Sequence, residues 1–359
     1  MNMLPDPTSM LAAVLHGVGD LRMEDIPRPQ AGPGEVLVQV GACGVCGSDI
    51  PRVWHKGTYR FPTVCGHEFA GTVAAVGAGV SDLPLGQAVT VYPLLWCGRC
   101  PACEQGQYAR CQDYGYLGSR NDGGFARYVV APRRNLLPLP PGVSIEEGTM
   151  TEPAAVALHA LKRGGGCAPG ETVVIFGAGP VGLLVAQWAR ASGAAQVIIF
   201  DLQPQALDLA RTLGFTLVFA ANAVDPLATV QQLTGKRLAD ITVEAAGTAV
   251  TLTAAITCAG NGGRVILLGN PNGDVTLPSA LISTLMRREL TLVGTWNSSF
   301  SATGNHDDWR TVLAAVAAGT IQLKPLITHR FPLAGTVEAL VLLRDRHEYA
   351  AKVLIEAQR

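Results

Sequence analysis

Charge is scarce in this chain. Of its 359 residues, 27 are Lys or Arg and 28 are Asp or Glu, so charged residues make up 15%, below the roughly 25% of average soluble domains. The formal net charge is −1 and no basic run exceeds two residues, which argues against nucleic acid as a partner. The sequence has no apolar stretch of about 18 residues that could cross a membrane. Its first ten residues also lack the basic and apolar segments of a signal peptide, so we predict a cytoplasmic location.

Apolar residues are abundant, at 48%, and their spacing divides the chain into three stretches. Up to about residue 141, short apolar runs alternate with Gly and Pro, which predicts a β-rich domain. From about 170 to 295, apolar runs alternate with helical segments, which predicts a doubly wound parallel α/β sheet with helices on both faces. We place the boundaries so that the three stretches are 1–160, 161–295 and 296–359.

Individual elements follow from the same patterns. The expected strands are residues 35–40, 68–76, 88–92, 125–131, 172–176, 196–200, 217–219, 241–244, 264–268, 290–293, 328–331 and 352–355. One helix is expected to end near Ala191, and another to cover residues 308–318.

Four cysteines lie close together in one segment, with two, two and seven residues between them: Cys97, Cys100, Cys103 and Cys111. Four thiolates at such spacings can bind one zinc ion tetrahedrally, and the intervening glycines and proline suit the turns that such a loop needs. Two local disulfides, or reduced cysteines packed in a core, are the alternatives. In a reducing compartment this spacing favours a structural zinc site.

A glycine motif opens the α/β stretch. It directly follows an expected strand and comprises Gly177, Ala178, Gly179, Pro180, Val181 and Gly182. In such a motif Gly177 permits the tight turn, Gly179 lets the backbone approach a pyrophosphate, and Gly182 lets the helix pack on the strand. The helix N-terminus can then bind phosphate, and Pro180 suits its first turn. An ordinary glycine-rich turn is the alternative.

Asp201 ends the next expected strand, 19 residues after the motif. A carboxylate at this point can accept hydrogen bonds from the ribose hydroxyls of NAD and would repel the 2′-phosphate of NADP. We therefore predict NAD, although Arg211 on the following helix could still reach such a phosphate.

A second set of metal-type ligands lies in the β-rich part. Cys46 is in a Gly-rich turn, His67 and Glu68 are adjacent, and Glu152 precedes a helix. One thiolate, one imidazole and one or two carboxylates form a mixed set typical of catalytic zinc with an open position. Each residue alone is more commonly structural, and the residues by themselves do not show that these positions meet in space.

Family resemblance connects these motifs. The segments G-V-C-G-S-D, G-H-E, the cysteine segment, D-G-G-F-A-R-Y, T-E-P and G-A-G-P-V-G occur in this order through the chain. Together they resemble the zinc-dependent medium-chain alcohol and polyol dehydrogenases, in particular their polyol-phosphate branch. The resemblance implies a GroES-like β-barrel catalytic domain, interrupted by a Rossmann domain and resumed at the C-terminus. It also implies two zinc ions per chain and a homodimer or homotetramer.

The same resemblance assigns roles to residues. Cys46, His67 and Glu152, with Glu68 in or next to the coordination shell, would bind the catalytic zinc, and the four-cysteine segment would bind the structural one. Ser48 would accept the proton of the alcohol, with Glu152 or Glu68 assisting, while hydride passes to NAD. Many relatives carry a histidine at the position of Pro51. Proline cannot titrate, so the residue that would pass the proton on to solvent is not assigned.

The expected substrate is a sugar alcohol or sugar-alcohol phosphate, oxidised to the ketose. Arg52 and Arg120 lie near the active-site motifs and are candidates for binding a phosphate, because guanidinium groups bind phosphate oxygens in pairs. Alternatively these arginines are solvated or pair with acids such as Asp122. Other functions remain open: an unphosphorylated-polyol dehydrogenase, a threonine-dehydrogenase-like enzyme, and a non-catalytic NAD-binding protein.

Overall fold

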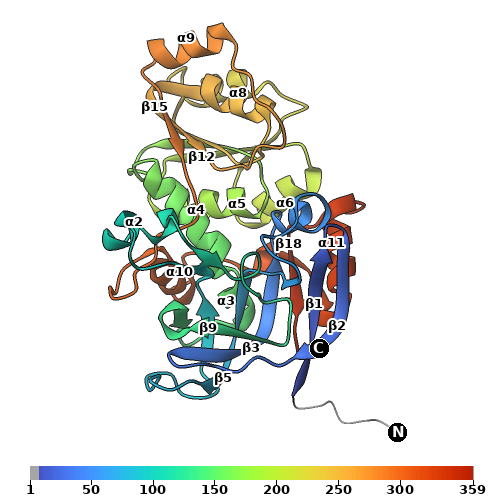
Figure 1. The fold of residues 1–359 in the computed structure, drawn as a ribbon. Helices are drawn as coiled ribbons and strands as arrows, with labels where there is room; N and C mark the ends of the chain where they lie inside the picture. Colours follow the sequence, from blue (N-terminus) through green and yellow to red (C-terminus); the bar gives the residue numbers. More distant parts are fainter. Residues whose placement is uncertain (1–7, 359) are drawn as a thin grey trace. The chain divides into compact units, whose positions relative to one another are not determined.

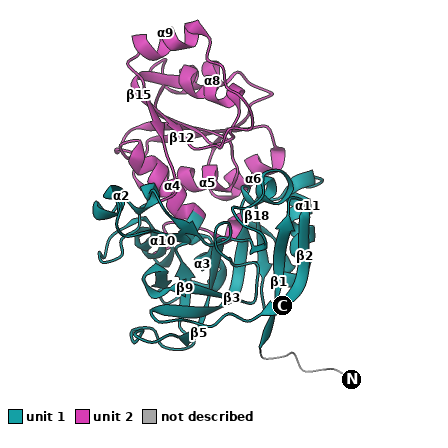
Figure 2. Ribbon diagram, in the orientation of Figure 1, with its two compact units in different colours: residues 1–152, 299–317, 327–359 teal, residues 153–298, 318–326 magenta. Residues whose placement is uncertain are grey.

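The computed structural model describes residues 8–358, which form two compact units (Figure 1). The first unit contains the described residues up to Glu152, Ser299–Ala317 and the described chain from Ile327 onward. The second contains Pro153–Ser298 and Ala318–Leu326 (Figure 2). Within residues 8–358, no helix is long and apolar enough to cross a membrane.

A seven-stranded sheet forms the frame of the first unit, in the order β10-β6-β5-β3-β18-β17, with β9 also paired to β3. Its strands are β3 (Glu35–Val45), β5 (Glu68–Val76), β6 (Ala88–Val91), β9 (Tyr128–Pro132), β10 (Leu136–Pro138), β17 (Ile327–Pro332) and β18 (Lys352–Glu356). The last strand pairs antiparallel with β3, so the end of the chain returns to the N-terminal sheet. The first unit therefore includes strands from both ends of the described chain.

A second sheet in this unit, in the order β2-β1-β4, was not among the expected strands. It consists of β1 (Ser9–Gly17), β2 (Asp20–Pro27) and β4 (Thr63–Val64), and a further two-stranded sheet pairs β7 (Leu94–Leu95) with β8 (Gly115–Tyr116). The residues of β2 are half-buried or exposed, so this strand lacks the clear alternation on which sequence prediction depends.

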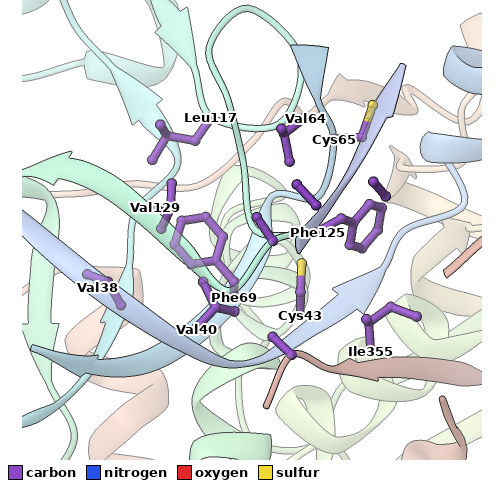
Figure 3. Packing of buried hydrophobic residues seen from close by; sticks show 14 of the residues in the cluster. Val38, Val40, Cys43, Val64, Cys65, Phe69, Leu117, Phe125, Val129 and Ile355 are labelled. Atoms are coloured by element: carbon purple, nitrogen blue, oxygen red, sulfur yellow. The ribbon is translucent and has the colours of Figure 1, made fainter. Parts of the chain in front are cut away.

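The core of the first unit packs around two aromatic rings, Phe69 and Phe125, both almost fully buried (Figure 3). Valines from β3 and β9 surround them, and Cys43 and Cys65 fill small gaps in the same cluster. These two cysteines have no accessible surface, as expected for thiols that act as small apolar side chains.

The second unit is a six-stranded parallel sheet in the order β13-β12-β11-β14-β15-β16, which confirms the predicted doubly wound α/β fold. Its strands are β11 (Thr172–Phe176), β12 (Gln196–Asp201), β13 (Leu217–Ala220), β14 (Ala239–Glu244), β15 (Ala259–Leu267) and β16 (Thr291–Gly294). Every residue of β11 is buried, as a strand in the middle of a covered sheet requires. The strand order reverses between β11 and β14, where folds of this type bind their ligands.

The helices connect and cover these sheets. They are α1 (Asp49–Pro51), α2 (Pro101–Glu104), α3 (Ile145–Thr149), α4 (Thr151–Arg163), α5 (Pro180–Ala191), α6 (Pro204–Thr212), α7 (Pro226–Leu233), α8 (Ala249–Cys258), α9 (Ser279–Arg287), α10 (Asp308–Ala317) and α11 (Thr336–Asp345). Single-turn helices are η1 (Arg52–Lys56), η2 (Tyr108–Arg110), η3 (Arg133–Asn135), η4 (Lys324–Leu326) and η5 (Leu333–Gly335).

Candidate metal centres and cofactor motif

The four-cysteine segment folds into one loop in which all four thiols converge. Each Sγ atom lies within 4.8 Å of the other three, and all four cysteines are free rather than disulfide-bonded. The short helix α2 begins with Pro101 directly after Cys100, and this helix and η2 form the turns between the cysteines. Four converging sulfurs form a donor set suited to tetrahedral zinc.

Hydrogen bonds within the loop act unequally on the thiols. Backbone N–H groups of Gln112 and Cys103 lower the pKa of Cys100 to about 6, whereas burial raises the pKa of Cys103 to about 12. A bound cation would favour the thiolate at all four positions. Next to the loop, the Trp96 ring is stacked on Tyr108 at 4.3 Å, and the Arg134 guanidinium lies 4.2 Å from the same indole.

A second cluster brings together three ligands that are distant in sequence or lie on different elements. Ligand atoms of Cys46, His67 and Glu68 all lie within 4.8 Å of one another. Cys46 follows the end of β3, and Glu68 opens β5, which pairs antiparallel with β3. The backbone N–H of Ser48 donates a hydrogen bond to Cys46 Sγ at 3.5 Å, which orients the thiol.

Asp49 and Arg52 support the histidine of this cluster. The Asp49 carboxylate is fully buried, forms an ion pair with Arg52 and lies 3.6 Å from Nδ1 of His67. Burial by itself would raise the pKa of Asp49, but His67 and Arg52 hold it below its usual value. Burial would likewise lower the pKa of His67, yet Asp49 and Cys46 raise it well above normal. At 3.6 Å the carboxylate is beyond hydrogen-bond distance of Nδ1, which has no hydrogen-bond partner among residues 8–358, so Asp49 acts on the imidazole through its charge.

Lys352 is a further member of the cluster that sequence reasoning missed. Its Nζ donates to both carboxylate oxygens of Glu68, at 2.9 and 2.7 Å. The only signal in the sequence is one lysine at the start of the apolar run of residues 353–355. Such a residue is easily interpreted as solvent-facing, but here it is buried.

Among the described residues, Glu152 is not one of the three converging ligands. It is nevertheless buried close to them. Its Oε1 accepts a hydrogen bond from Tyr116 Oη at 3.4 Å. Burial raises the pKa of Glu152 to about 7, and the negative charge of Glu68 acts in the same direction. The Tyr116 ring also contacts His67, with 5.8 Å between the ring centroids.

The remaining candidates of the first unit differ in exposure and pairing. Ser48 is exposed in the loop after Cys46. The charge of Arg52 is already balanced by Asp49. Arg120 lies between two tyrosines, 3.8 Å from the ring centroid of Tyr59 and 4.5 Å from that of Tyr114.

The glycine motif of the second unit has the geometry of a dinucleotide site. Gly177 has a φ of 109°, which side chains rarely adopt, and a Cβ on Gly182 would lie 2.0 Å from the carbonyl oxygen of Gly177. Gly179, by contrast, faces open space, with no atom within 4 Å of the point where a Cβ would lie, so a ligand can approach the backbone there. Helix α5 begins directly after it with Pro180, followed by Val181, so the free N–H groups of the first turn lie at this opening.

Asp201 contacts the motif directly. Its Oδ2 accepts a hydrogen bond from the backbone N–H of Ala178 at 2.6 Å, and its Oδ1 accepts from Gln203 at 2.8 Å. The carboxylate is therefore held rigidly at the carboxyl end of β12, next to the glycine turn. This is the position from which an acid contacts the ribose of a dinucleotide.

Comparison with known proteins finds a matching domain family for each of two parts of the chain. Residues 32–141 match the alcohol dehydrogenase GroES-like domain, and residues 180–318 match the zinc-binding dehydrogenase domain. The chain therefore belongs to the zinc-binding dehydrogenases, a family of zinc- and NAD(P)-dependent oxidoreductases that includes the polyol dehydrogenases.

Particular relatives are similar over nearly their whole length. Galactitol 1-phosphate 5-dehydrogenase of Escherichia coli K12 is 37% identical over 89% of this chain and 92% of its own. Sorbitol dehydrogenase of Bacillus subtilis is 31% identical over 98% of this chain and 99% of its own. The crystal structure of E. coli galactitol-1-phosphate dehydrogenase matches with a TM-score of 0.88 and 36% identity, covering 97% of this chain and all of that one. The polyol-dehydrogenase resemblance of the sequence motifs is confirmed.

Proposed function

We propose that this enzyme oxidises a secondary alcohol of a sugar alcohol or sugar-alcohol phosphate to the ketose, with NAD as hydride acceptor. The observation that carries the proposal is the convergence of Cys46, His67 and Glu68 within 4.8 Å. This donor set fits a catalytic zinc, because two or three protein ligands leave a position for substrate. The four-cysteine loop would bind a second, structural zinc.

The chain's own residues divide the remaining work. When bound, zinc supplies Lewis-acid chemistry that lowers the pKa of an alcohol hydroxyl. The Ser48 side chain is exposed beside the cluster and would accept the hydroxyl proton. Glu152, either as a direct ligand or as a nearby base, would assist, since its carboxylate is buried and accepts a hydrogen bond from Tyr116, whose ring contacts His67.

The glycine motif and Asp201 would bind the cofactor. The carboxylate of Asp201 favours the ribose hydroxyls of NAD over the phosphate of NADP by charge repulsion. Replacing Asp201 with Asn would weaken NAD binding by about tenfold, as the loss of a hydrogen bond to a charged group predicts. Titration with NADH and NADPH, followed by nucleotide fluorescence, measures this, and an unchanged preference for the form without the 2′-phosphate would contradict the assignment.

A phosphorylated polyol is the favoured substrate, with Arg120 as the phosphate ligand. Its Nε is buried without a hydrogen-bond partner, and among residues 8–358 the neighbouring Asp122 forms an ion pair with Arg60 rather than with Arg120. Two tyrosine rings hold the guanidinium in place, and Tyr114 in turn contacts Tyr116 of the catalytic cluster. Arg52 is less suited, because its charge is engaged by Asp49.

The decisive test is NAD reduction by the zinc-loaded enzyme against paired polyols and polyol phosphates, galactitol 1-phosphate included. Turnover confined to phosphorylated members supports the proposal. Turnover of free polyols favours the second candidate, a sorbitol-dehydrogenase-type activity. The observation that supports this candidate is the similarity to sorbitol dehydrogenase. If no compound of the panel is turned over while zinc and NAD are bound, the proposed substrate class is wrong.

Variants locate the phosphate contact. Arg120→Ala should raise the KM for a phosphorylated polyol by about tenfold or more, because a charged hydrogen bond is lost. The KM for a free polyol should stay within about twofold. Arg22→Ala is the control, because it removes an exposed guanidinium of the same unit that is paired with Asp20. Equal effects of Arg120→Ala on both substrates would rule out a phosphate role.

A homodimer or homotetramer is the expected assembly. Strand β16 is an exposed edge of the parallel sheet and carries Leu292, and Met286 on α9 is 73% exposed. Exposed edges and apolar side chains of this kind are commonly covered by another chain. Sedimentation velocity of the enzyme measures the assembly, and a monomer at micromolar concentration would contradict it.

A further inference from the structure

Glu244 is a buried carboxylate at the carboxyl end of β14, in the second unit. It is only 4% exposed, and within residues 8–358 no lysine or arginine forms an ion pair with it. Its Oε1 instead accepts hydrogen bonds from the backbone N–H groups of Ala246 and Gly247, both at 2.8 Å, and from the Thr251 hydroxyl at 2.7 Å. A buried carboxylate is costly unless such donors surround it, so the three donors and the carboxylate hold one another in place.

The donors belong to the segment that follows β14. Residues 245–248 connect this strand to helix α8, and Thr251 lies in the first turn of that helix. Because one carboxylate oxygen binds both the loop and the helix, the Glu244 side chain fixes the course of the chain between them.

The loop after β15 packs against the same residue. The backbone carbonyl of Glu244 accepts hydrogen bonds from the N–H groups of Leu268 and Gly269, at 2.9 and 2.8 Å. An added Cβ on Gly269 would lie 2.7 Å from Oε2 of Glu244 and 2.3 Å from the backbone nitrogen of Gly247. The loops after β14 and β15 are therefore in close contact, and Glu244 touches both of them.

The strand order places these two loops beside the nicotinamide half of the proposed cofactor site. Asp201 ends β12, where it would bind the adenosine ribose, and the glycine motif follows β11, the next strand of the sheet. β14 is the neighbour of β11 on its other edge, and β15 is the neighbour of β14. A dinucleotide that runs from Asp201 across the glycine motif must then have its second nucleotide beside the loops after β14 and β15.

We propose, resting on the proposed NAD site at the glycine motif and Asp201, that Glu244 is a positioning residue for the nicotinamide half of the cofactor. Its carboxylate holds the backbone of residues 245–247 against the loop after β15, and the two loops together form one wall of this half of the site. Without the carboxylate, two backbone N–H groups and one hydroxyl lose their buried acceptor, so the loop rearranges and the wall is lost. The adenosine half, bound at Asp201, keeps its contacts.

The test compares the zinc-loaded wild type with Glu244→Ala, Glu244→Asp and Glu244→Gln. The dissociation constant of NADH is measured by nucleotide fluorescence, and that of ADP, which lacks the nicotinamide riboside, by its competition with NADH. Asp240→Ala is the matched control. Asp240 lies in the same strand and its Oδ2 also accepts a backbone N–H, from Thr172 at 2.8 Å, but near the amino end of the strand.

In Glu244→Ala we expect the dissociation constant of NADH to rise about tenfold and that of ADP to stay within about twofold. Glu244→Gln should bind NADH within about threefold of the wild type, because its amide oxygen can accept from the same donors. Asp240→Ala should lower the melting temperature and leave both dissociation constants unchanged. If Glu244→Ala does not fold, Glu244→Asp replaces it, since this variant keeps the charge on a shorter side chain and should weaken NADH binding about fivefold.

Two results would overturn the role of Glu244. Equal losses of NADH and ADP affinity would show that it supports the second unit as a whole. An unchanged dissociation constant of NADH in Glu244→Ala, or in Glu244→Asp where the alanine variant does not fold, would show that the loops keep their conformation without it.

The wild type and Asp201→Asn separate these failures from a failure of the proposed function. If the wild type binds NADH and Asp201→Asn binds it more weakly, normal NADH binding by Glu244→Ala overturns only the role of Glu244. A wild-type enzyme that binds neither NADH nor NADPH overturns the proposed cofactor site as well.

Discussion

The two metal-type clusters of this protein are built in opposite ways. The four-cysteine loop takes all its ligands from the short segment between Cys97 and Cys111. The mixed cluster takes its ligands from the end of β3 and the start of β5, and its buried supports from α1, α4 and β18. The first can therefore form from local turns, whereas the second exists only when the sheet of the first unit is complete.

The clusters also differ in how charge is balanced. The cysteine loop contains four thiols and no buried countercharge of its own, so a cation is its natural partner. The mixed cluster already contains two buried ion pairs, Asp49 with Arg52 and Glu68 with Lys352. We infer that loss of metal from the loop costs stability with little effect on activity, whereas changes in the mixed cluster also cost activity.

The largest expected effect is on turnover through Cys46. Cys46→Ser removes a zinc ligand and with it several kcal/mol of transition-state stabilisation, so kcat should fall by on the order of 10³-fold or more. NAD binding should persist, because Gly177–Gly182 and Asp201 belong to the other unit. Steady-state rates and NAD titration measure the two properties, and undiminished turnover would refute the metal role of Cys46.

Next in size is the effect of the cysteine loop on stability. Cys103→Ala should lower the free energy of unfolding by about 4 kcal/mol through loss of the metal, and the melting temperature by roughly 10 °C. The kcat of the enzyme that remains folded should stay close to that of the wild type. Differential scanning calorimetry with zinc analysis measures the shift. Cys167→Ala is the control, since this cysteine belongs to neither cluster. A wild-type melting temperature with only one zinc bound would contradict the comparison.

A smaller loss of stability is expected at Asp49. Asp49→Asn leaves Arg52 without its buried partner and should cost about 3 kcal/mol, measured by urea unfolding. It should also lower kcat about tenfold, because the negative charge beside His67 is lost. Asp20→Asn breaks the exposed pair with Arg22 and should leave the free energy of unfolding almost unchanged, because water screens that pair. Equal costs for the two pairs would mean that burial does not set the strength of the Asp49 interaction.

The smallest effect is expected at Tyr116. Tyr116→Phe keeps the ring against His67 but removes the 3.4 Å hydrogen bond to Glu152. Loss of one such bond is worth about 1 kcal/mol, so kcat/KM should fall roughly fivefold. Tyr108→Phe, within the cysteine loop, should leave kcat/KM unchanged and is the control. A wild-type kcat/KM in Tyr116→Phe would show that this hydrogen bond to Glu152 does not contribute to the reaction.

Much of the second unit was predictable from its sequence. Strand β11 is a run of five buried residues that leads directly into Gly177, and this order is typical of a dinucleotide turn. The strand-and-helix alternation predicted the parallel sheet correctly, because each element carries its own periodicity. The hairpin of β1 and β2 was missed, and β2 in particular lacks a buried face.

Within the site, the cysteine loop and the glycine motif were determined by the sequence alone. Each lies within one short segment, so the spacing of its residues along the chain fixes how they come together. The tertiary structure decided which carboxylates and cations meet. It paired Arg52 with Asp49, left the Nε of Arg120 without a partner, and placed Lys352 against Glu68, 284 residues away in the sequence. Such pairs depend on which strands lie side by side. No local pattern around a lone lysine shows that β18 will lie against β3, because that pairing is set by the packing of the whole sheet.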